Sequence, residues 1–481
     1  MDPYDLLIIG GGINGTAIAR DAAIRGAKVL LVERDDLASH TSSASSKLIH
    51  GGLRYLEYGE FRLVREALRE REILLKTAPH IVRPLRFILP QSRGMRPFWM
   101  LRAGLYLYDL FSLRGSLRHS RRVSAGEKAV RSPLADPRRR LLSYWDAWVD
   151  DSRLTVLNAV DAAENGAEIL TRTELLSARR DGDLWTATLS GGRTVSAKAI
   201  VNAAGAWVGD VLGRLSAPSE SRVRLVKGSH IVVPRLWESE HAYILQQPDG
   251  RVVFALPYLG DYTLIGTTDI PVESAENPAI EADERRYLCE AADRYFSRQL
   301  VPADIVWSYS GVRALHDDGA ADAKAVTRDY HLELDEERRL LSVFGGKITT
   351  ARALAEEALD RLGMDGRRST GWTALPGGEL GPAFLDWLGH VGAWMPQPLL
   401  ARLSRAYGTR MRDIVGSATS LGELGRHHGA GLYEAELRYL KTHEFARTAE
   451  DVLWRRTKLG LAMSPADQKA LAKRMRAQGP S

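Results

Sequence analysis

The first 34 residues constrain the fold most, because they read as a strand, a glycine turn, a helix and a second strand in succession. The apolar runs at 6–9 and 28–32 are typical of buried parallel strands. Gly10, Gly12 and Gly15 follow the first run with the spacing G-x-G-x-x-G. In such a turn the glycines permit the bend, the backbone's approach to a pyrophosphate, and close packing of helix on strand. The N–H groups that begin the helix favour phosphate, so the segment predicts a dinucleotide site.

An acidic residue, Glu33, ends the second predicted strand, where a carboxylate can accept hydrogen bonds from a ribose hydroxyl. That carboxylate would repel a 2′-phosphate, so the pattern disfavours NADP and leaves NAD or FAD. The adjoining Ile13, Asn14 and Arg34 belong to the same candidate cofactor site. Glycine turns also occur for purely structural reasons, so a βαβ unit without a ligand is the alternative.

A serine-rich stretch follows, and residues 42–57 read SSASSKLIHGGLRYLE. Alone, a Ser/Thr cluster indicates a solvated loop or a helix cap. Together with the N-terminal turn it resembles the segment of the FAD-dependent glycerol-3-phosphate dehydrogenase family that carries FAD from its pyrophosphate to its isoalloxazine ring. The strings EAELRYL at 434–440 and LWRRTKLG at 453–460 also match, so the resemblance covers nearly the whole chain. It implies FAD as the cofactor, with contacts from this stretch by Thr41, Ser42, Ser45, Ser46, Lys47, Leu48, His50, Gly51 and Gly52.

Two later segments are predicted to approach the same cofactor. A buried strand at 198–202 closes on small residues, and it looks like the "ATG" element of two-dinucleotide flavoproteins, with Ala203 where Thr often stands. Ala204, Gly205 and Trp207 are its candidate contacts. A second glycine turn at 345–350 opens a helix, and its N–H groups could stabilise negative charge on reduced flavin. Its candidates are Gly346, Lys347 and Thr349.

The composition limits the class of protein. The chain has 481 residues and a net charge of +6 from 66 basic and 60 acidic residues, which suits an anionic substrate or lipid surface without requiring nucleic acid. Its one cysteine, Cys289, excludes an intrachain disulfide and a redox dithiol. The first strand leaves no room for a secretory signal, and no apolar run has transmembrane length. We therefore expect a cytoplasmic protein, or one peripheral on the cytoplasmic face of a membrane.

The pattern of elements predicts an α/β fold with an added α region. Residues 1–75, 144–215 and 328–375 form a discontinuous, Rossmann-like FAD-binding domain. Residues 76–143 and 216–327 form a mixed or antiparallel β domain that covers the substrate. Residues 383–481 form a helical domain, for which oligomer or partner contacts are the expected role and a homodimer one option.

An aromatic and arginine-rich stretch at 95–123 has two interpretations. Its Trp and Tyr residues beside arginines could dock on anionic headgroups. The alternative is a buried helix of the substrate-covering domain.

The resemblance implies a reaction: oxidation of sn-glycerol 3-phosphate to dihydroxyacetone phosphate, with hydride passing from C2 to flavin N5 and electrons to a membrane quinone. A phosphate dianion requires fixed cations, and the planar guanidinium of arginine can donate two hydrogen bonds to it. The candidates that match the family's motifs are Arg54, His230, Arg313, Arg328 and Lys347. Tyr55, Thr268 and Asp269 are expected to complete the substrate pocket.

The proton step has more than one candidate. Histidine suits it at neutral pH, and His230 at the head of a strand is expected to act as the base or to hydrogen-bond the substrate, whereas His50 is expected to touch flavin. Arg313 could stabilise the charge of an alkoxide. Lys347 is the third predicted catalytic residue, after His230 and Arg313. No Cys/His cluster has metal-site spacing, so no metal is expected. The rivals are an oxidase that uses O2 and, from another class, a non-catalytic, RNA-associated flavoprotein.

Overall fold

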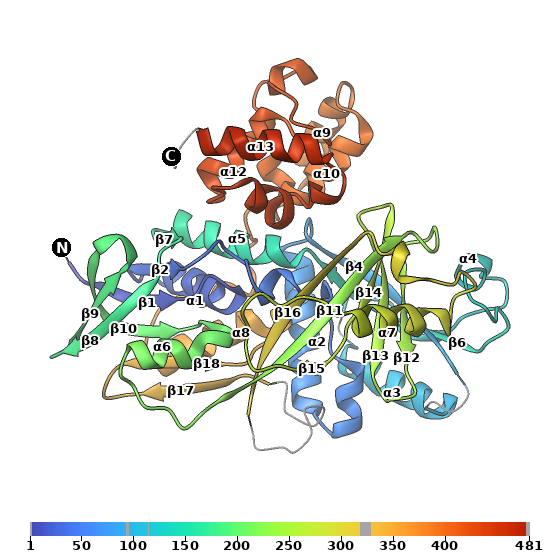
Figure 1. Cartoon of the computed structure of the whole chain (residues 1–481), viewed down its shortest axis with the longest axis horizontal. Helices are drawn as coiled ribbons and strands as arrows, with labels where there is room; N and C mark the ends of the chain where they lie inside the picture. The colour runs from blue at the N-terminus through green and yellow to red at the C-terminus, as the bar shows by residue number, and fades with distance from the viewer. Residues whose placement is uncertain (1, 93–95, 114, 318–328, 478–481) are drawn as a thin grey trace.

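A computed structural model describes residues 2–92, 96–113, 115–317 and 329–477. Two β-sheets lie side by side below a separate group of C-terminal helices (Figure 1). Within the described residues, the first sheet has eight strands and the second has ten.

The first sheet has a parallel centre, in which β1 lies between β10 and β2. Strand β2 is buried along its whole length, and residues 6–9 of β1 and 199–202 of β10 are buried beside it, as in doubly covered parallel sheets. Six strands follow one another across the sheet: β17 (His331–Asp335), β18 (Leu340–Phe344), β10 (Thr194–Asn202), β1 (Tyr4–Ile9), β2 (Val29–Glu33) and β7 (Glu168–Thr171). A seventh strand, β9 (Leu184–Leu189), pairs with β10. The eighth, β8 (Leu175–Asp181), pairs with β9.

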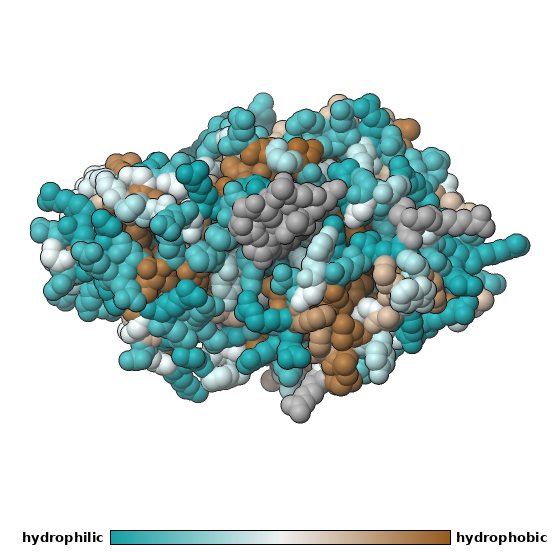
Figure 2. Space-filling view, turned by 90° about the horizontal axis from the view of Figure 1, so that it is seen from below, coloured by the Kyte–Doolittle hydropathy of each residue, from teal (hydrophilic) through white to brown (hydrophobic). Residues whose placement is uncertain are grey.

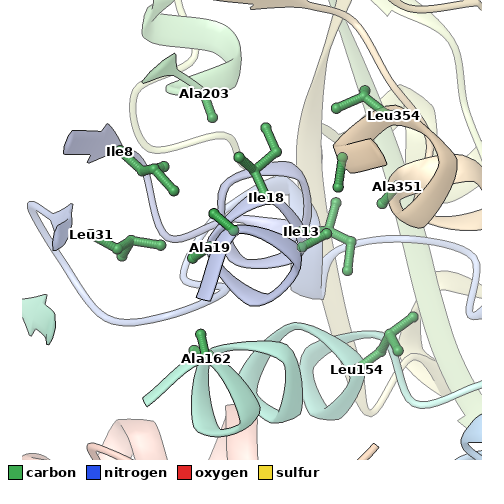
Figure 3. Packing of buried hydrophobic residues seen from close by; sticks show 14 of the residues in the cluster. Ile8, Ile13, Ile18, Ala19, Leu31, Leu154, Ala162, Ala203, Ala351 and Leu354 are labelled. Atoms are coloured by element: carbon green, nitrogen blue, oxygen red, sulfur yellow. The ribbon is translucent and has the colours of Figure 1, made fainter. Parts of the chain in front are cut away.

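Helix α1 (Ile13–Ile24) packs between α5 (Asp151–Glu164) and α8 (Ala351–Arg361), as Figure 3 shows. Small side chains such as Ala19 and Ala162 let α1 and α5 approach closely, while Ile18 and Leu354 fill the space beside them. The glycine turn before α1 is therefore held on a rigid, fully buried element.

The second sheet is mainly antiparallel, with one parallel pair between β12 and β4. Its strands are β15 (Ile270–Pro271), β11 (Val223–Pro234), β14 (Tyr262–Gly266), β13 (Val252–Tyr258), β12 (His241–Gln246), β4 (Val82–Pro90), β6 (Leu141–Val149) and β3 (Leu48–Ile49), with β16 (Trp307–His316) on β11 and β5 (Arg121–Arg122) on β6. In the register of this sheet, His230 of β11 lies between Gly266 of β14 and Tyr309 of β16.

Strand β6 pairs with β4 in the second sheet, although the sequence predicts that residues from 144 onward belong to the FAD-binding domain. Helix α2 (Phe61–Thr77) begins after Gly59, whose φ of 74° separates it from a 3-10 turn, Leu53–Tyr58. Helix α7 (Ala282–Asp293) lies between the two segments that hold β15 and β16. The division into domains stays a prediction.

The remaining helices flank the sheets or form the C-terminal group. They are α3 (Phe98–Phe111), α4 (Lys128–Arg131), α6 (Val208–Arg214), α9 (Pro382–Gly392), α10 (Gln397–Tyr407), α11 (Met411–Val415), α12 (Glu434–His443) and α13 (Pro465–Ala477). A π-helical turn, Asp451–Arg456, joins this group to the first sheet, since Arg455 and Arg456 both pair with Asp36 after β2. Among the described residues, no helix is both long and apolar enough to cross a membrane.

Candidate active site

A cavity of about 390 Å³ opens between the two sheets and collects the motifs predicted from the sequence. This volume is within the usual range for ligand sites. The predicted residues that line it are Gly10, Gly12, Ile13, Asn14, Glu33, Arg34, Thr41, Ser42, Ser45, Ser46, Leu48, His50, Tyr55, Ala204, Gly205, Trp207, His230, Arg313, Gly346, Lys347 and Thr349.

The first glycine turn has no room for side chains. Gly10 adopts φ +113°, and a Cβ there would lie 2.6 Å from the carbonyl oxygen of Ala203. A Cβ at Gly15 would lie 2.0 Å from the carbonyl oxygen of Gly10, so this glycine serves packing and does not line the cavity. Gly12 faces Ser42, whose hydroxyl accepts the N–H of Ile13 at 2.9 Å. Because side chains at Gly10 and Gly15 would clash, backbone atoms line this turn and form a cradle.

At one end of the cavity, Glu33 accepts the backbone N–H groups of Gly11 at 2.6 Å and Asp35 at 2.8 Å. Burial raises the pKa of the Glu33 carboxyl above its ordinary value, although these two hydrogen bonds oppose the shift. Nearby, the Arg34 guanidinium lies 4.1 Å from the ring centroid of Trp207, a cation–π contact.

The second glycine turn meets the first. The Asn14 side chain donates from Nδ2 to the carbonyl oxygen of Gly345 at 3.1 Å, and its buried Oδ1 has no hydrogen-bond partner among the described residues. Gly346 adopts φ +103°, and a Cβ there would lie 2.6 Å from Asn14 Nδ2. Two segments more than 300 residues apart in sequence thus border one cavity.

His230 lies at the inner wall of the cavity and is 2% exposed. Its Nε2 shares a hydrogen bond of 2.9 Å with the Ser46 hydroxyl, and its ring stacks on Tyr309 with centroids 4.8 Å apart. Nδ1 has no hydrogen-bond partner within the described part of the chain. Burial lowers the pKa of His230 well below its ordinary value, and Lys47 and Arg313 lower it further. The imidazole is therefore neutral at neutral pH and able to accept a proton.

Two cations, Arg313 and Lys347, line the same cavity as His230. Arg313 pairs with Asp269, and its Nη2 donates to Thr267 Oγ1 at 3.0 Å. Lys347 Nζ lies 4.1 Å from the ring centroid of Tyr55 and makes no hydrogen bond to any described residue. Arginine and lysine so placed can meet an anionic ligand.

The other predicted site residues lie behind the lining. Lys47 is buried and donates to Asp151 Oδ2 and to the carbonyl oxygen of Ser43, both at 2.7 Å, so it holds the serine stretch in place. Burial lowers the pKa of its ammonium to about 8. Thr268 Oγ1 donates to buried Glu284 at 2.7 Å, and Asp269 orients Arg313.

Gly51 packs on Tyr108, and Gly52 on Tyr55. Arg54 donates to the Tyr58 hydroxyl at 3.1 Å. Arg328 lies outside the described residues.

Several lining residues were missed from the sequence. They come from strand ends and from the sheet opposite the glycine turns, and they include Thr173, Glu174, Arg214, Gly228, Phe254, Thr267, Gly311 and Asp329. Gly228, in the string KGSH that ends at His230, and Gly311, in the string YSGVR, carried a local signal, since a glycine inside a strand indicates a close approach.

One group of side chains could in principle hold a metal ion: Glu33, Asp35 and His40. The Glu33 oxygens already accept two backbone N–H groups, and His40 Nε2 lies 2.9 Å from Asp35 Oδ2. These contacts account for the cluster without a cation.

The residues present fit FAD. The glycine cradle suits a pyrophosphate, and Asn14 Oδ1 and Lys347 Nζ, which make no hydrogen bond to a described residue, are polar atoms available to a ligand at the second turn. Asn14, Gly346 and Lys347 would hold the cofactor at this turn.

Two family descriptions match successive parts of the chain: "FAD dependent oxidoreductase" over residues 5–361, and "C-terminal domain of alpha-glycerophosphate oxidase" over residues 368–477. The structure resembles that of the Bacillus halodurans glycerol-3-phosphate dehydrogenase complexed with FAD, with a TM-score of 0.75 and 24% identity over 99% of this chain and 94% of that one. The predicted fold class is thereby confirmed.

Curated relatives are similar over almost their full length. A "Glycerol-3-phosphate dehydrogenase" from Pseudomonas aeruginosa is 50% identical over 99% of this chain and 96% of the relative. A "D-erythritol 1-phosphate dehydrogenase" from Brucella abortus is also 50% identical, over 97% of this chain and 96% of the relative. The "Aerobic glycerol-3-phosphate dehydrogenase" of Escherichia coli is 46% identical over 98% and 96%. The chain therefore belongs to the family of FAD-dependent glycerol-3-phosphate dehydrogenases, with FAD as its cofactor.

Proposed function

We propose that this protein oxidises sn-glycerol 3-phosphate to dihydroxyacetone phosphate and passes the electrons to a membrane quinone. The observation that carries the proposal is the meeting of both glycine turns with His230, Arg313 and Lys347 at one cavity. The names of relatives at 46–50% identity support the substrate.

In this proposal Arg313 and Lys347 bind the substrate's phosphate or its developing alkoxide. Asp269 and Thr267 fix the Arg313 fork, so its orientation is set before substrate binds. Bound FAD supplies the acceptor for the hydride from C2. The phosphate contact would select phosphorylated polyols over free glycerol.

His230 is the proposed base for the C2 hydroxyl. When Nε2 donates its proton to the Ser46 hydroxyl oxygen, Nδ1 carries the free lone pair that accepts the substrate proton. The lowered pKa of His230 keeps the ring neutral before the reaction. The Ser46 hydroxyl can accept this N–H, so the contact is compatible with the tautomer that the reaction needs.

Transfer to a quinone requires contact with a membrane, and helix α3 offers a surface for it. Leu101, Leu105 and Tyr108 of α3 are buried in the core, whereas Trp99 and Tyr106 are 71% and 68% exposed. Figure 2 shows apolar side chains gathered on the face seen from below, where α2 and α3 lie. We propose that this surface docks on the cytoplasmic face of the membrane.

Anaerobic spectra of the purified flavoprotein test the substrate. We expect glycerol 3-phosphate to bleach the flavin band and glycerol to leave it unchanged. D-Erythritol 1-phosphate is the necessary comparison, because one relative carries that name. A higher specificity constant for D-erythritol 1-phosphate would reassign the substrate, and no bleaching by either phosphate would contradict the proposal.

The acceptor is tested separately. Quinone reduction without stoichiometric peroxide supports the dehydrogenase, whereas rapid turnover with O2 and one peroxide per substrate identifies an oxidase. RNA binding by a protein that no polyol phosphate reduces would favour the non-catalytic alternative.

A further inference from the structure

A buried ionic contact connects the C-terminal helices to the cavity. Lys458, 7% exposed, follows the π-helical turn, and its Nζ lies 3.1 Å from Asp150 Oδ1 and 3.6 Å from Asp151 Oδ1. Asp151 is fully buried at the start of α5. The ammonium group of Lys458, in the C-terminal region, thus helps to balance the charge of the buried Asp151 carboxylate in α5.

The same carboxylate holds the serine stretch that borders the cavity. Asp151 Oδ2 accepts the Ser45 hydroxyl at 2.7 Å, the Ser45 N–H at 3.1 Å and Lys47 Nζ at 2.7 Å. The next residue, Ser46, bonds His230. Lys458 therefore reaches the hydrogen bond that orients His230 through a short series of buried polar contacts.

An aromatic stack makes a second connection. Trp454 of the π-helical turn stacks on Trp307 of β16 with centroids 4.6 Å apart, and Trp307 lies 5.2 Å from Tyr309. Tyr309 stacks on His230 and donates its hydroxyl to the Ser45 carbonyl oxygen at 2.8 Å. Gly460 makes room for this stack, since a Cβ there would lie 2.4 Å from Trp454 Cζ2.

The charge balance at Asp151 depends on Lys458. Burial would raise the pKa of Asp151, but Lys47 and Lys458 lower it below its ordinary value. The charged groups that face His230 are Lys47, Arg313 and Asp151. Loss of the Lys458 ammonium leaves more net negative charge beside His230.

We infer that Trp454 and Lys458 of the C-terminal region are positioning residues for the reaction, and that they hold His230 and Ser45–Ser46 in place through Tyr309 and Asp151. The inference rests on the proposed function for the role of His230. It gives the C-terminal helices a part in the active site, beyond the oligomer or partner contacts expected from the sequence.

The test uses the full-length flavoprotein and two measurements. One is the limiting rate of flavin reduction by glycerol 3-phosphate without oxygen. The other, independent of turnover, is the pKa of His230 from NMR of 13C-labelled histidine, assigned with His230→Gln.

For Lys458→Met we expect the limiting rate of flavin reduction to be about 10–100-fold lower, because a small displacement of His230 slows the reaction by such a factor. The change in substrate affinity should be smaller. The His230 pKa should rise because a cation is lost, and Lys458→Arg should restore most of the rate. Trp454→Leu should slow reduction while Trp454→Phe, which keeps a ring, slows it less. These Trp454 variants also carry the test if Lys458→Met does not fold.

Arg402→Met is the matched control, because it breaks a largely buried ion pair between Arg402 and Glu436, both of which belong to the C-terminal region. Its rate and His230 pKa should stay at the wild-type values despite lost stability. The inference is overturned if Lys458→Met matches wild type in both measurements, or if Arg402→Met reproduces its changes. A wild-type enzyme that glycerol 3-phosphate does not reduce contradicts the proposed function instead, and the NMR shift still decides whether Lys458 acts on His230.

Discussion

Individual glycines decide where the two main functional side chains lie. A Cβ at Gly228 would stand 2.3 Å from Arg313 Nη2, and one at Gly266 would stand 2.2 Å from His230 Cδ2. Both glycines are in strands, where the missing side chain leaves space for a neighbour's functional group. The positions of His230 and Arg313 therefore depend on two residues that have no side chain.

Gly228→Ala should displace the Arg313 guanidinium and the Thr267 hydroxyl that it meets, because a Cβ there would lie 2.3 Å from Nη2 and 2.6 Å from Oγ1. We expect kcat/KM for glycerol 3-phosphate to fall by about 10–100-fold, with FAD content unchanged. Gly389→Ala in α9, where a Cβ meets nothing within 4 Å, is the control. Wild-type steady-state kinetics in Gly228→Ala would remove Arg313 from the substrate site.

At the scale of elements, the second glycine turn borders the same cavity as the first. It needs a left-handed backbone at Gly346 and leaves no space for a Cβ beside Asn14. The two turns can face one cavity because β18 and β1 are both parallel neighbours of β10 in the first sheet.

Gly346→Ala should weaken FAD binding through backbone strain of about 1–3 kcal/mol and through the clash with Asn14. Fluorescence titration of the apoprotein with FAD measures the change. Gly363→Ala carries a similar strain, at φ +67°, but has open space around it. An equal loss of FAD affinity in both variants would show that general destabilisation, and not the cofactor site, is responsible.

The exposed side of α3 leads to a prediction about membranes. Trp99→Ser combined with Tyr106→Ser should reduce co-sedimentation with vesicles containing anionic lipid by at least about 10-fold, because each buried aromatic contributes roughly 1.5–3 kcal/mol. Trp372→Ser, at a residue 67% exposed in another part of the chain, should have no effect. If the two variants bind vesicles equally well, α3 is not the docking surface.

For the whole molecule, buried ion pairs join the C-terminal helices to the nucleotide-binding sheet. Arg153 of α5 pairs with Glu444, and both side chains are almost fully buried. Asp451 accepts the N–H groups of Arg447 and Thr448 and pairs with Arg172 and Arg455. Removing one partner of such a pair costs several kcal/mol, since the other charge stays buried.

Asp451 gives a pH dependence with a definite sign. Burial would raise its pKa, but the Arg447 N–H and Arg455 lower it from 3.8 to about 2. Its contribution to stability, about 2 kcal/mol, is present above the unfolded pKa and is lost as the pH falls through the folded value.

We therefore expect Asp451→Asn to be less stable than wild type at pH 5–7, with a difference that shrinks toward pH 2. Urea unfolding at several pH values measures this. A difference that is independent of pH would mean that the side chain acts through packing and not through its charge.

The sequence by itself determined the local parts of this protein. Gly10, Gly12 and Gly15 predicted the first turn, and the apolar strands around it predicted the parallel sheet, because tight turns and buried strands depend on neighbouring residues. The cavity lining also includes His230, Arg313 and Lys347, which the family resemblance had selected.

Only the tertiary structure decided what depends on contacts between distant segments. It brought Asn14 to Gly345, set Lys47 against Asp151 behind the lining, and paired β6 with the second sheet. It also brought Trp454 and Lys458 next to the elements that hold His230. Such contacts leave no periodicity or spacing in the chain, because they arise from how separate elements pack, and a side chain's partner is fixed only when both segments are in place.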